Sequence, residues 1–129
     1  MHPLPPYAEL LGLSAAARDG ETLWTMPFRD AVVGRPGYLH GGAIAGLLEF
    51  AALSAVQAAL PEGATVKPVN VSVDFLRGGA AHETYASAVV TRLGNRIANV
   101  EAHAWQLDRG KPIAAARMNL VVRRRKEAA

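Results

Sequence analysis

The amino-acid sequence predicts an α+β domain in which a curved antiparallel β-sheet wraps around one long hydrophobic helix. Three observations support this fold class. Residues 42–60 form a continuous apolar segment of helical length, residues 69–75 alternate between apolar and polar side chains, and two hairpin-type turns separate the last three strand-like segments. A sheet with one helix lying across its concave face buries both patterns in a single core.

The N-terminal third predicts a short docked helix, one strand and a loop. Residues 7–13 have the pattern of a helix too short to be stable alone, so we expect it to pack on the rest of the domain. Residues 14–20 predict a loop, and residues 22–28, rich in β-forming side chains, predict the first strand. Residues 30–37 contain three glycine or proline residues and predict a second loop, which leads into the long helix.

The long helix is predicted over about residues 41–60. It is apolar on nearly every face, and such a helix must be enclosed by other structure. Glu49 is then expected to be a carboxylate in the middle of a buried rod, with no Lys or Arg within a dozen residues. An unpaired buried charge is costly, so we expect Glu49 to have a functional reason. Gly41 and Gly42 follow His40 at the helix start, where glycines allow a ligand to approach backbone amides that attract negative charge.

Four strands are predicted after the helix, which is expected to end at Pro61. Residues 69–75 predict a half-buried strand, and Pro68 indicates an edge position or an irregular start. Three more strands are predicted over residues 83–93, 96–107 and 112–123. The hairpin-type turns between them make these three strands sequential antiparallel neighbours.

Composition places the chain among globular proteins of one domain. Its 129 residues are enough for a single core, half of them are hydrophobic and only 19% are charged. The absence of cysteine excludes disulfides, thiolate metal sites and a cysteine nucleophile. The first ten residues lack the pattern of a secretion signal, and clear strands follow the Ala-rich helix. We therefore expect a soluble cytoplasmic protein without a membrane partner.

Charge and polar patterning indicate no nucleic acid, metal or cofactor. The formal net charge is +3, and a basic segment over residues 123–129 is interpreted as a solvated tail. No aromatic residues are interleaved with basic ones, as nucleic-acid binding would favour. His103 and Trp105 share a strand face, but the sequence shows no cluster of ligands that could hold a metal ion.

Three stretches together resemble a known family. They are GYLHGGAIAGLLEFAA (37–52), VSVDFLRGG (71–79) and LGNRIANVEAHAWQLDRGKPIAAARMNLVV (93–122). An acidic residue nine positions after the His of HGG, then an FLR-type strand and a glycine-centred hairpin, is similar to the hotdog-fold acyl-CoA thioesterases of the PaaI-like and 4-hydroxybenzoyl-CoA thioesterase group. The resemblance covers the chain from about Tyr7 to Val122 and implies one hotdog domain over residues 1–129.

The resemblance implies that the protein hydrolyses an acyl-CoA or aryl-CoA thioester to the free acid and coenzyme A. Glu49 then acts as nucleophile or as general base for water, and the backbone amide of Gly41 polarises the thioester carbonyl. His40 is a third catalytic candidate, although we expect it mainly to orient the turn through a hydrogen bond to the backbone. The candidates for substrate contact are Gly42, Gly34, Leu53, Phe75, Arg77, Asn95 and Arg96. The last three could meet the phosphates of coenzyme A.

The spacing of Gly41 and Glu49 predicts a site shared between two chains. They are eight residues apart, which on one helix separates them by roughly 12 Å. One carbonyl group is too small to be reached by both. We therefore expect the amide of one chain to face the Glu of another across a two-fold axis. The resemblance implies the same arrangement, with a homodimer formed through the sheet, two sites per dimer, and a dimer of dimers as the tetramer.

The sequence departs from the family pattern beside the predicted site. Many members have Asn or Gln six residues before the His, where this chain has Gly34. Some members have Ser or Thr at the positions of Leu53 or about Pro68, although Ser54 and Asn70 lie next to these. The hydrogen bonds that hold the carbonyl or the attacking water are therefore expected to be incomplete or differently built.

Two alternative functions stay open at this point. The first is a hotdog protein that binds acyl-CoA without hydrolysing it, and Gly34 is its main support. The second is a hotdog hydratase or dehydratase, which uses a His and an acid on a similar helix. That group spaces the two residues further apart than His40 and Glu49, so it ranks last.

Overall fold

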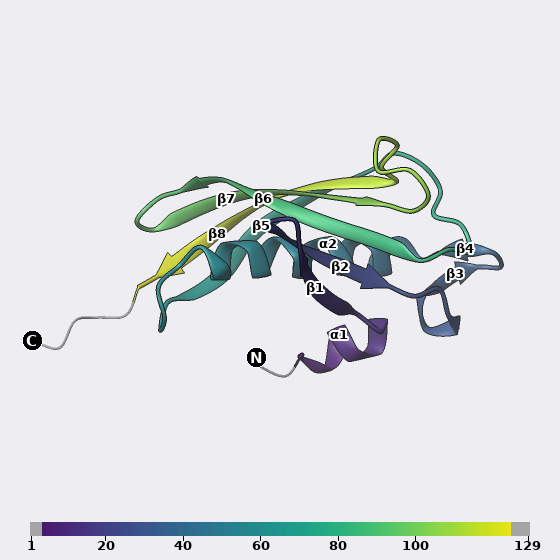
Figure 1. The fold of residues 1–129 in the computed structure, drawn as a ribbon, viewed down its shortest axis with the longest axis horizontal. Helices are drawn as coiled ribbons and strands as arrows, with labels where there is room; N and C mark the ends of the chain where they lie inside the picture. The colour runs from purple at the N-terminus through teal and green to yellow at the C-terminus, as the bar shows by residue number, and fades with distance from the viewer. Residues whose placement is uncertain (1–3, 125–129) are drawn as a thin grey trace, which may run out of the picture.

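The main feature of the structure, a computed structural model that describes residues 4–124, is a six-stranded antiparallel sheet packed on one side against a long helix. In chain order the elements are α1 (Pro6–Leu11), β1 (Ser14–Arg18), β2 (Glu21–Met26), a 3-10 turn (Asp30–Val32), β3 (Val33–Arg35), β4 (Tyr38–Leu39), α2 (Gly41–Ala58), β5 (Thr65–Phe75), β6 (Thr84–Leu93), β7 (Ile97–Trp105) and β8 (Ala114–Arg123). The sheet order is β1-β2-β6-β7-β8-β5, and β3 and β4 form a separate hairpin. Figure 1 shows α2 beneath β6, β7 and β8, with α1 lower in the view.

The core lies between α2 and the concave face of the sheet. Leu47, Leu48 and Val56 of α2 are fully buried there. The strands opposite them contribute mainly small side chains, which are Ala86, Ala98, Ala102, Ala104, Ala114 and Ala116. Small side chains let the helix approach the sheet closely, so the two pack at high density. By length and composition α2 could cross a membrane, but here it lies along the sheet.

The strongest sequence patterns are found where they were predicted. β6, β7 and β8 are sequential antiparallel neighbours, as their hairpin turns predict. The long helix begins at Gly41 as expected and ends at Ala58, two residues before the predicted end. The predicted short helix is α1, which ends where Gly12 takes a left-handed conformation with φ 73°.

The prediction of a loop over residues 14–20 is wrong. Ser14–Arg18 forms β1, which pairs with β2 through a two-residue turn at Asp19 and Gly20. Both turn residues have positive φ, as a tight hairpin turn requires. Every residue of β1 is exposed, so the strand carries no apolar alternation that could reveal it.

The strand predicted over residues 69–75 is present within β5, but the prediction that it is half-buried is wrong for the single chain. β5 is an edge strand of eleven residues, and only Val66 and Val73 pack against the core. Val69, Val71 and Phe75 are 60%, 43% and 55% exposed. The register shifts between Pro68 and Asn70, which confirms the irregular edge that the proline predicted. One long, apolar edge of the sheet is therefore uncovered in the isolated chain.

The predicted basic tail is described only at its start. Arg123 ends β8 and Arg124 follows it, whereas residues 125–129 lie outside the described residues. The end of β8 and the β3–β4 hairpin lie at opposite ends of the molecule (Figure 1). The start of α2 lies at the hairpin end.

Candidate functional site

The start of α2 leaves one backbone donor without an acceptor. His40 caps the helix: its Nδ1 accepts the N–H of Gly42 at 2.8 Å, and its carbonyl accepts the N–H groups of Ala43 and Ile44. The Gly41 N–H alone, among these first amides, has no acceptor within residues 4–124. A helix N-terminus attracts negative charge, so this amide is placed to bind an oxyanion.

The cap also explains the residue types at the helix start. A side chain at position 42 would put its Cβ 2.9 Å from Nδ1 of His40, so only glycine leaves room for the capping ring. Because Nδ1 of His40 accepts a hydrogen bond, we assign its neutral ring a proton on Nε2. His40 therefore does what the sequence mainly suggested, which is to orient the turn. Its part in catalysis stays a prediction.

Gly41 lines a pocket of about 360 Å³. Its lining is mostly glycine and backbone from two loops and the helix start, namely Gly34, Arg35, Tyr38, Leu39, His40, Gly41, Gly78 and Gly79. The guanidinium of Arg35 lies 4.4 Å from the centre of the Tyr38 ring, so the pocket wall carries one stacked cation. Arg35 and Tyr38 were not predicted as site residues, because the strands β3 and β4 that carry them are too short to show a periodic pattern. The sequence feature that could have indicated them is their position shortly before the HGG motif.

Gly34 lies where the β3–β4 ladder shifts register, between the pairs Val33–Leu39 and Arg35–Tyr38. A Cβ at Gly34 would stand 3.0 Å from the backbone Cα of His40, closer than side chains ordinarily come to backbone. A polar side chain at this position would therefore displace the loop that carries His40. The backbone conformation therefore favours glycine at position 34, where many family members have Asn or Gln.

Glu49 lies in the middle of α2 and is half-buried, so the expectation of a fully buried carboxylate is wrong for the single chain. It makes no hydrogen bond or ion pair with any residue in the described range 4–124. The reason is that sheet and α1 cover α2 incompletely. Ala45 and Leu53, which share the stripe of Glu49 at a spacing of four residues, are also only half-buried. The predicted pocket residue Leu53 thus lies on the same open stripe.

The polar residues noted near Glu49 form hydrogen bonds with groups other than Glu49. The Ser54 hydroxyl accepts the indole N–H of Trp24 at 2.9 Å and donates to the Ala51 carbonyl. The Gln57 amide donates to the Ala64 carbonyl at 2.8 Å. Asn70, the other residue noted beside a missing Ser or Thr, accepts a hydrogen bond from Asn119. None of these side chains forms a hydrogen bond with the Glu49 carboxylate.

The predicted phosphate contacts fall at both ends of the sheet. Arg77 follows β5 close to the start of α2, and its Nη1 donates to the Pro112 carbonyl at 2.7 Å. Phe75 lies at the same end, and its ring stands 3.4 Å from where a Cβ of Gly41 would be. Asn95 and Arg96 form the β6–β7 turn at the other end, so one chain does not bring Arg77 together with them.

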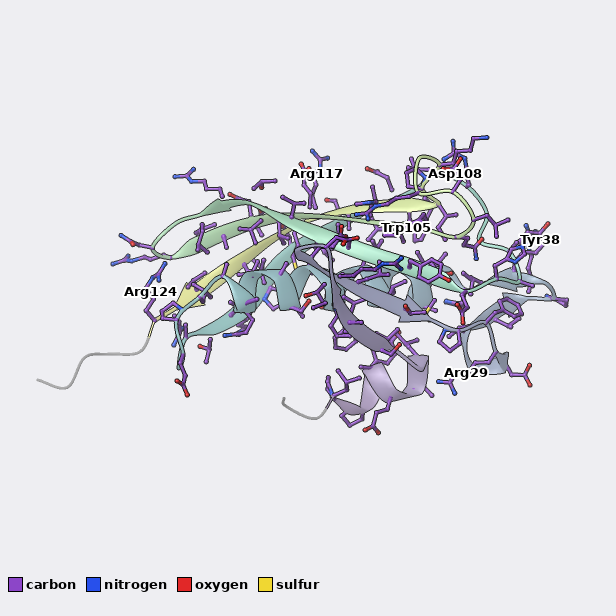
Figure 2. All side chains as sticks on the ribbon, viewed as in Figure 1. Arg29, Tyr38, Trp105, Asp108, Arg117 and Arg124 are labelled. Atoms are coloured by element: carbon purple, nitrogen blue, oxygen red, sulfur yellow. The ribbon has the colours of Figure 1, made fainter. Side chains whose placement is uncertain are left out.

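The β6–β7 turn has basic neighbours that the sequence analysis missed. Arg124 donates to the Gly94 carbonyl in this turn, and Figure 2 shows Arg124 and Tyr38 at opposite ends of the molecule. Arg92 joins Asn95 and Arg96 in lining a hollow of about 680 Å³. Arg124 is 30 residues from Gly94 in the sequence, so only the structure shows that it joins Arg92 and Arg96 in one basic end.

A second polar cluster lies on the outer face of the sheet. Arg109 donates two hydrogen bonds to Glu21, at 2.8 and 3.1 Å, and one to Nε2 of His103 at 3.3 Å. The Arg109 guanidinium also lies 4.3 Å from the ring centre of Trp105. The hydrogen bond from Arg109 lowers the pKa of Glu21, and burial lowers the pKa of His103. Within residues 4–124 no three His, Asp or Glu residues gather as a metal site would need.

Comparison with known proteins decides the family. A family model of the thioesterase superfamily matches residues 36–113, which is more than half of the chain and includes Gly41 and Glu49. The chain belongs to the thioesterase superfamily. The resemblance inferred from the sequence is thus confirmed, and the protein is a thioester hydrolase. No curated protein sequence matches the chain significantly.

Solved structures show that the fold of this thioesterase is the hotdog fold, as predicted. A phenylacetic acid degradation-related protein from Ralstonia eutropha is 28% identical, with 93% of this chain and 92% of that chain covered and a TM-score of 0.82. A thioesterase from Haemophilus influenzae is 25% identical, with coverage of 91% and 82% and a TM-score of 0.84. A Bacillus halodurans protein solved with CoA is 22% identical, with coverage of 95% and 82% and a TM-score of 0.86.

Proposed function

We propose that this thioesterase hydrolyses an acyl-CoA or aryl-CoA thioester, with the Gly41 amide and the Glu49 carboxylate as the two halves of its site. The observation that carries the proposal is the Gly41 N–H, which is fixed at a helix start and has no acceptor within residues 4–124. Thioester cleavage puts negative charge on the carbonyl oxygen, and a fixed donor stabilises that charge without reorganising. The Bacillus halodurans protein of the same fold, which was solved with CoA, supports a CoA thioester as the substrate.

Glu49 supplies the second half, by one of two routes. As a nucleophile, its carboxylate oxygen bonds to the carbonyl carbon, the C–S bond breaks and CoA leaves as thiolate. Water then hydrolyses the resulting anhydride, which yields the free acid, restores the Glu49 carboxylate and releases one proton that the CoA thiolate takes up. As a general base, Glu49 takes a proton from the attacking water and passes it to the leaving thiolate. Both routes need an ionised carboxylate that is not tied up in an ion pair, and Glu49 forms no ion pair within residues 4–124.

The edge strand β5 supports a site shared between two copies of the chain. Gly41 and Glu49 are separated by eight residues of one helix, or roughly 12 Å. A long, exposed and apolar edge strand favours pairing with another chain, and β5 presents such an edge. Antiparallel pairing of two β5 strands about a two-fold axis sets the Phe75 end of one beside the Val66 end of the other.

The same pairing gathers the phosphate contacts that one chain leaves apart. Arg77 lies at the Phe75 end of β5, whereas Asn95 and Arg96 lie at the opposite end of the sheet. In an antiparallel pair, Asn95 and Arg96 of the second copy approach the Gly41 pocket of the first. Arginine and amide side chains there can hold the phosphates of coenzyme A. A dimer of dimers stays a further prediction of the sequence.

The test is thiol release from a panel of aliphatic and aromatic CoA thioesters. We expect saturable turnover by the purified protein, and a kcat at least about 100-fold lower in Glu49→Gln, which keeps the side-chain volume and removes the charge. The KM should change little, because the carboxylate acts mainly in the transition state. Parental kcat in Glu49→Gln would contradict the mechanism even if hydrolysis is observed.

A second candidate function is binding of acyl-CoA without turnover. The close approach of Gly34 to the His40 backbone favours it, because no side chain can be placed there to hold the carbonyl or a water. This candidate predicts that CoA thioesters raise the melting temperature while no thiol is released. The hydratase alternative needs a histidine base, and Nδ1 of His40 is already engaged with Gly42.

A further inference from the structure

A carboxylate that attacks a carbonyl or activates water is effective only when it is held in one orientation. Glu49 has no hydrogen-bond donor within residues 4–124, and the hydroxyl and amide groups on its own helix are engaged elsewhere. A donor must therefore come from another element that packs beside Glu49. α1 is one such element, because it packs on α2 at Gly46, one turn before Glu49.

Tyr7 of α1 places a hydroxyl on the turn of α2 that precedes Glu49. If Gly46 carried a Cβ, that atom would lie 2.9 Å from Cε2 of Tyr7 and 3.3 Å from its hydroxyl oxygen. Positions 46 and 49 are neighbours on the helix surface, with Cβ atoms about 5–6 Å apart. Side chains on a helix lean toward its N-terminus, which is the direction of Gly46 from Glu49.

The Tyr7 ring is fixed in place while its hydroxyl is unused. The ring lies 6.3 Å from that of Phe50, which in turn lies 6.2 Å from Trp24. Arg29 donates to the carbonyls of Glu9 and Leu10 and so anchors the end of α1. The Tyr7 side chain is 48% exposed, and its hydroxyl makes no hydrogen bond with any other described residue. A fixed ring with an open hydroxyl is suited to hold a neighbouring carboxylate.

We propose that Tyr7 is a positioning residue of the thioesterase, whose hydroxyl donates to the Glu49 carboxylate directly or through the attacking water. The inference rests on the proposed role of Glu49. It also explains why residue 46 is glycine, since a side chain there would displace Tyr7 from the surface of α2. The hydroxyl comes from the N-terminal helix, far from the motif in sequence.

The test is Tyr7→Phe, which keeps the ring and removes only the hydroxyl. We expect kcat to fall about tenfold or more, the effect of losing one hydrogen bond to a charged group, with KM and melting temperature unchanged. The acidic side of the pH profile of kcat should move to higher pH, because the ionised carboxylate loses a donor. The matched control is Tyr85→Phe, which loses a hydroxyl that donates to Glu83 on the outer face and should keep parental kcat.

The two proposals can fail separately. If Glu49→Gln is inactive while Tyr7→Phe keeps the parental kcat and pH profile, Tyr7 has no positioning role and the proposed function stands. If Glu49→Gln keeps the parental kcat, the proposed role of Glu49 fails, and the role of Tyr7 fails with it. A double variant decides whether Tyr7 acts through Glu49: adding Tyr7→Phe to Glu49→Gln should cost no further activity. An additional tenfold loss in that background would overturn the inference.

Discussion

Two polar regions of this thioesterase differ in what their hydrogen-bonding groups do. On the outer face of the sheet, Glu21, His103 and Arg109 are joined to one another by three hydrogen bonds. Along α2, the Gly41 N–H and the Glu49 carboxylate have no partner within residues 4–124. Buried and half-buried polar groups are normally paired, so the unpaired set is the one that calls for a ligand. The pattern of partners therefore separates a structural cluster from a functional one.

The perturbed pKa values point to the wrong region if they are taken alone. Shifted pKa values often mark functional sites, but ion pairs inside a fold shift them too. The pKa of Glu21 is lowered first by its hydrogen bond to Arg109, and that of His103 by burial. Both causes are internal to the outer cluster. Geometry, and not titration, identifies the candidate site here.

The largest effect is expected when the unpaired donor is removed. Gly41→Pro deletes the N–H, and proline is favoured at the first position of a helix. His40 has φ −70° and ψ 134°, the extended conformation that a residue before proline needs. We expect kcat to fall about 10²–10³-fold with the helix intact by circular dichroism. Gly41→Ala keeps the N–H and should stay close to parental activity, although its Cβ touches the Phe75 ring.

Mixing two inactive variants tests whether the unpaired groups come from different chains. Glu49→Gln and Gly41→Pro each damage both sites of a homodimer. In a heterodimer with a shared site, one site receives Gly41 from the first chain and Glu49 from the second. After subunit exchange of a 1:1 mixture, about one quarter of all sites should be intact, by the symmetry of a two-fold dimer. Recovered activity near that fraction is expected, and its absence would mean that each site lies within one chain.

The sequence predicts the fold wherever a periodic pattern meets a turn signal. Residues 41–58 and the three C-terminal strands are of this kind, and the structure differs from their predicted ends by a few residues at most. β1 was missed because all five of its residues are exposed and three of them are alanine. The burial of β5 was overestimated because alternation shows which face is apolar, not what covers that face.

Of the site, the sequence predicted the central residues but not their surroundings. HGG and Glu49 could be identified because an acid in an apolar helix is unusual and because two glycines mark the start of that helix. Their surroundings could not, because they depend on loops and on α1. Only coordinates show that Gly34 touches the His40 backbone and that Tyr7 sits on Gly46. Long-range packing of this kind leaves no local sequence signal.

A smaller effect, and one on stability alone, is expected in the outer cluster. Arg109→Gln removes an ion pair with Glu21 whose side chains are 47% and 33% exposed, together with the cation–π contact to Trp105. Such contacts contribute about 0.5–1 kcal/mol each at exposed sites, so we expect a loss of about 1 kcal/mol in the free energy of unfolding. Arg117→Gln, on the same outer face (Figure 2), is the control and should change little. A loss of kcat in Arg109→Gln would mean that the outer cluster also contributes to catalysis.

The smallest effect is the pH dependence of stability that the outer cluster produces. The pKa of His103 is lowered from its ordinary 6.5, so below that pH the unfolded chain binds more protons than the folded one. The contribution of His103 to stability is therefore fully present above pH 6.5. It is lost as the pH falls through the pKa that His103 has in the folded protein. Glu21, whose pKa is lowered from 4.5, adds a second decrease below that pH, with the same sign.

His103→Gln separates these two contributions. It removes the titrating ring, so the melting temperature should change less between pH 6.5 and 5 than in the parent, whereas the decrease below pH 4.5 should remain because Glu21 is intact. Thermal unfolding monitored across this range measures both. The kcat near neutral pH should stay at the parental value, since His103 contacts only the outer cluster. An unchanged slope between pH 6.5 and 5 would mean that another group controls acid stability, and the lowered pKa of His103 would then contribute little to the fold.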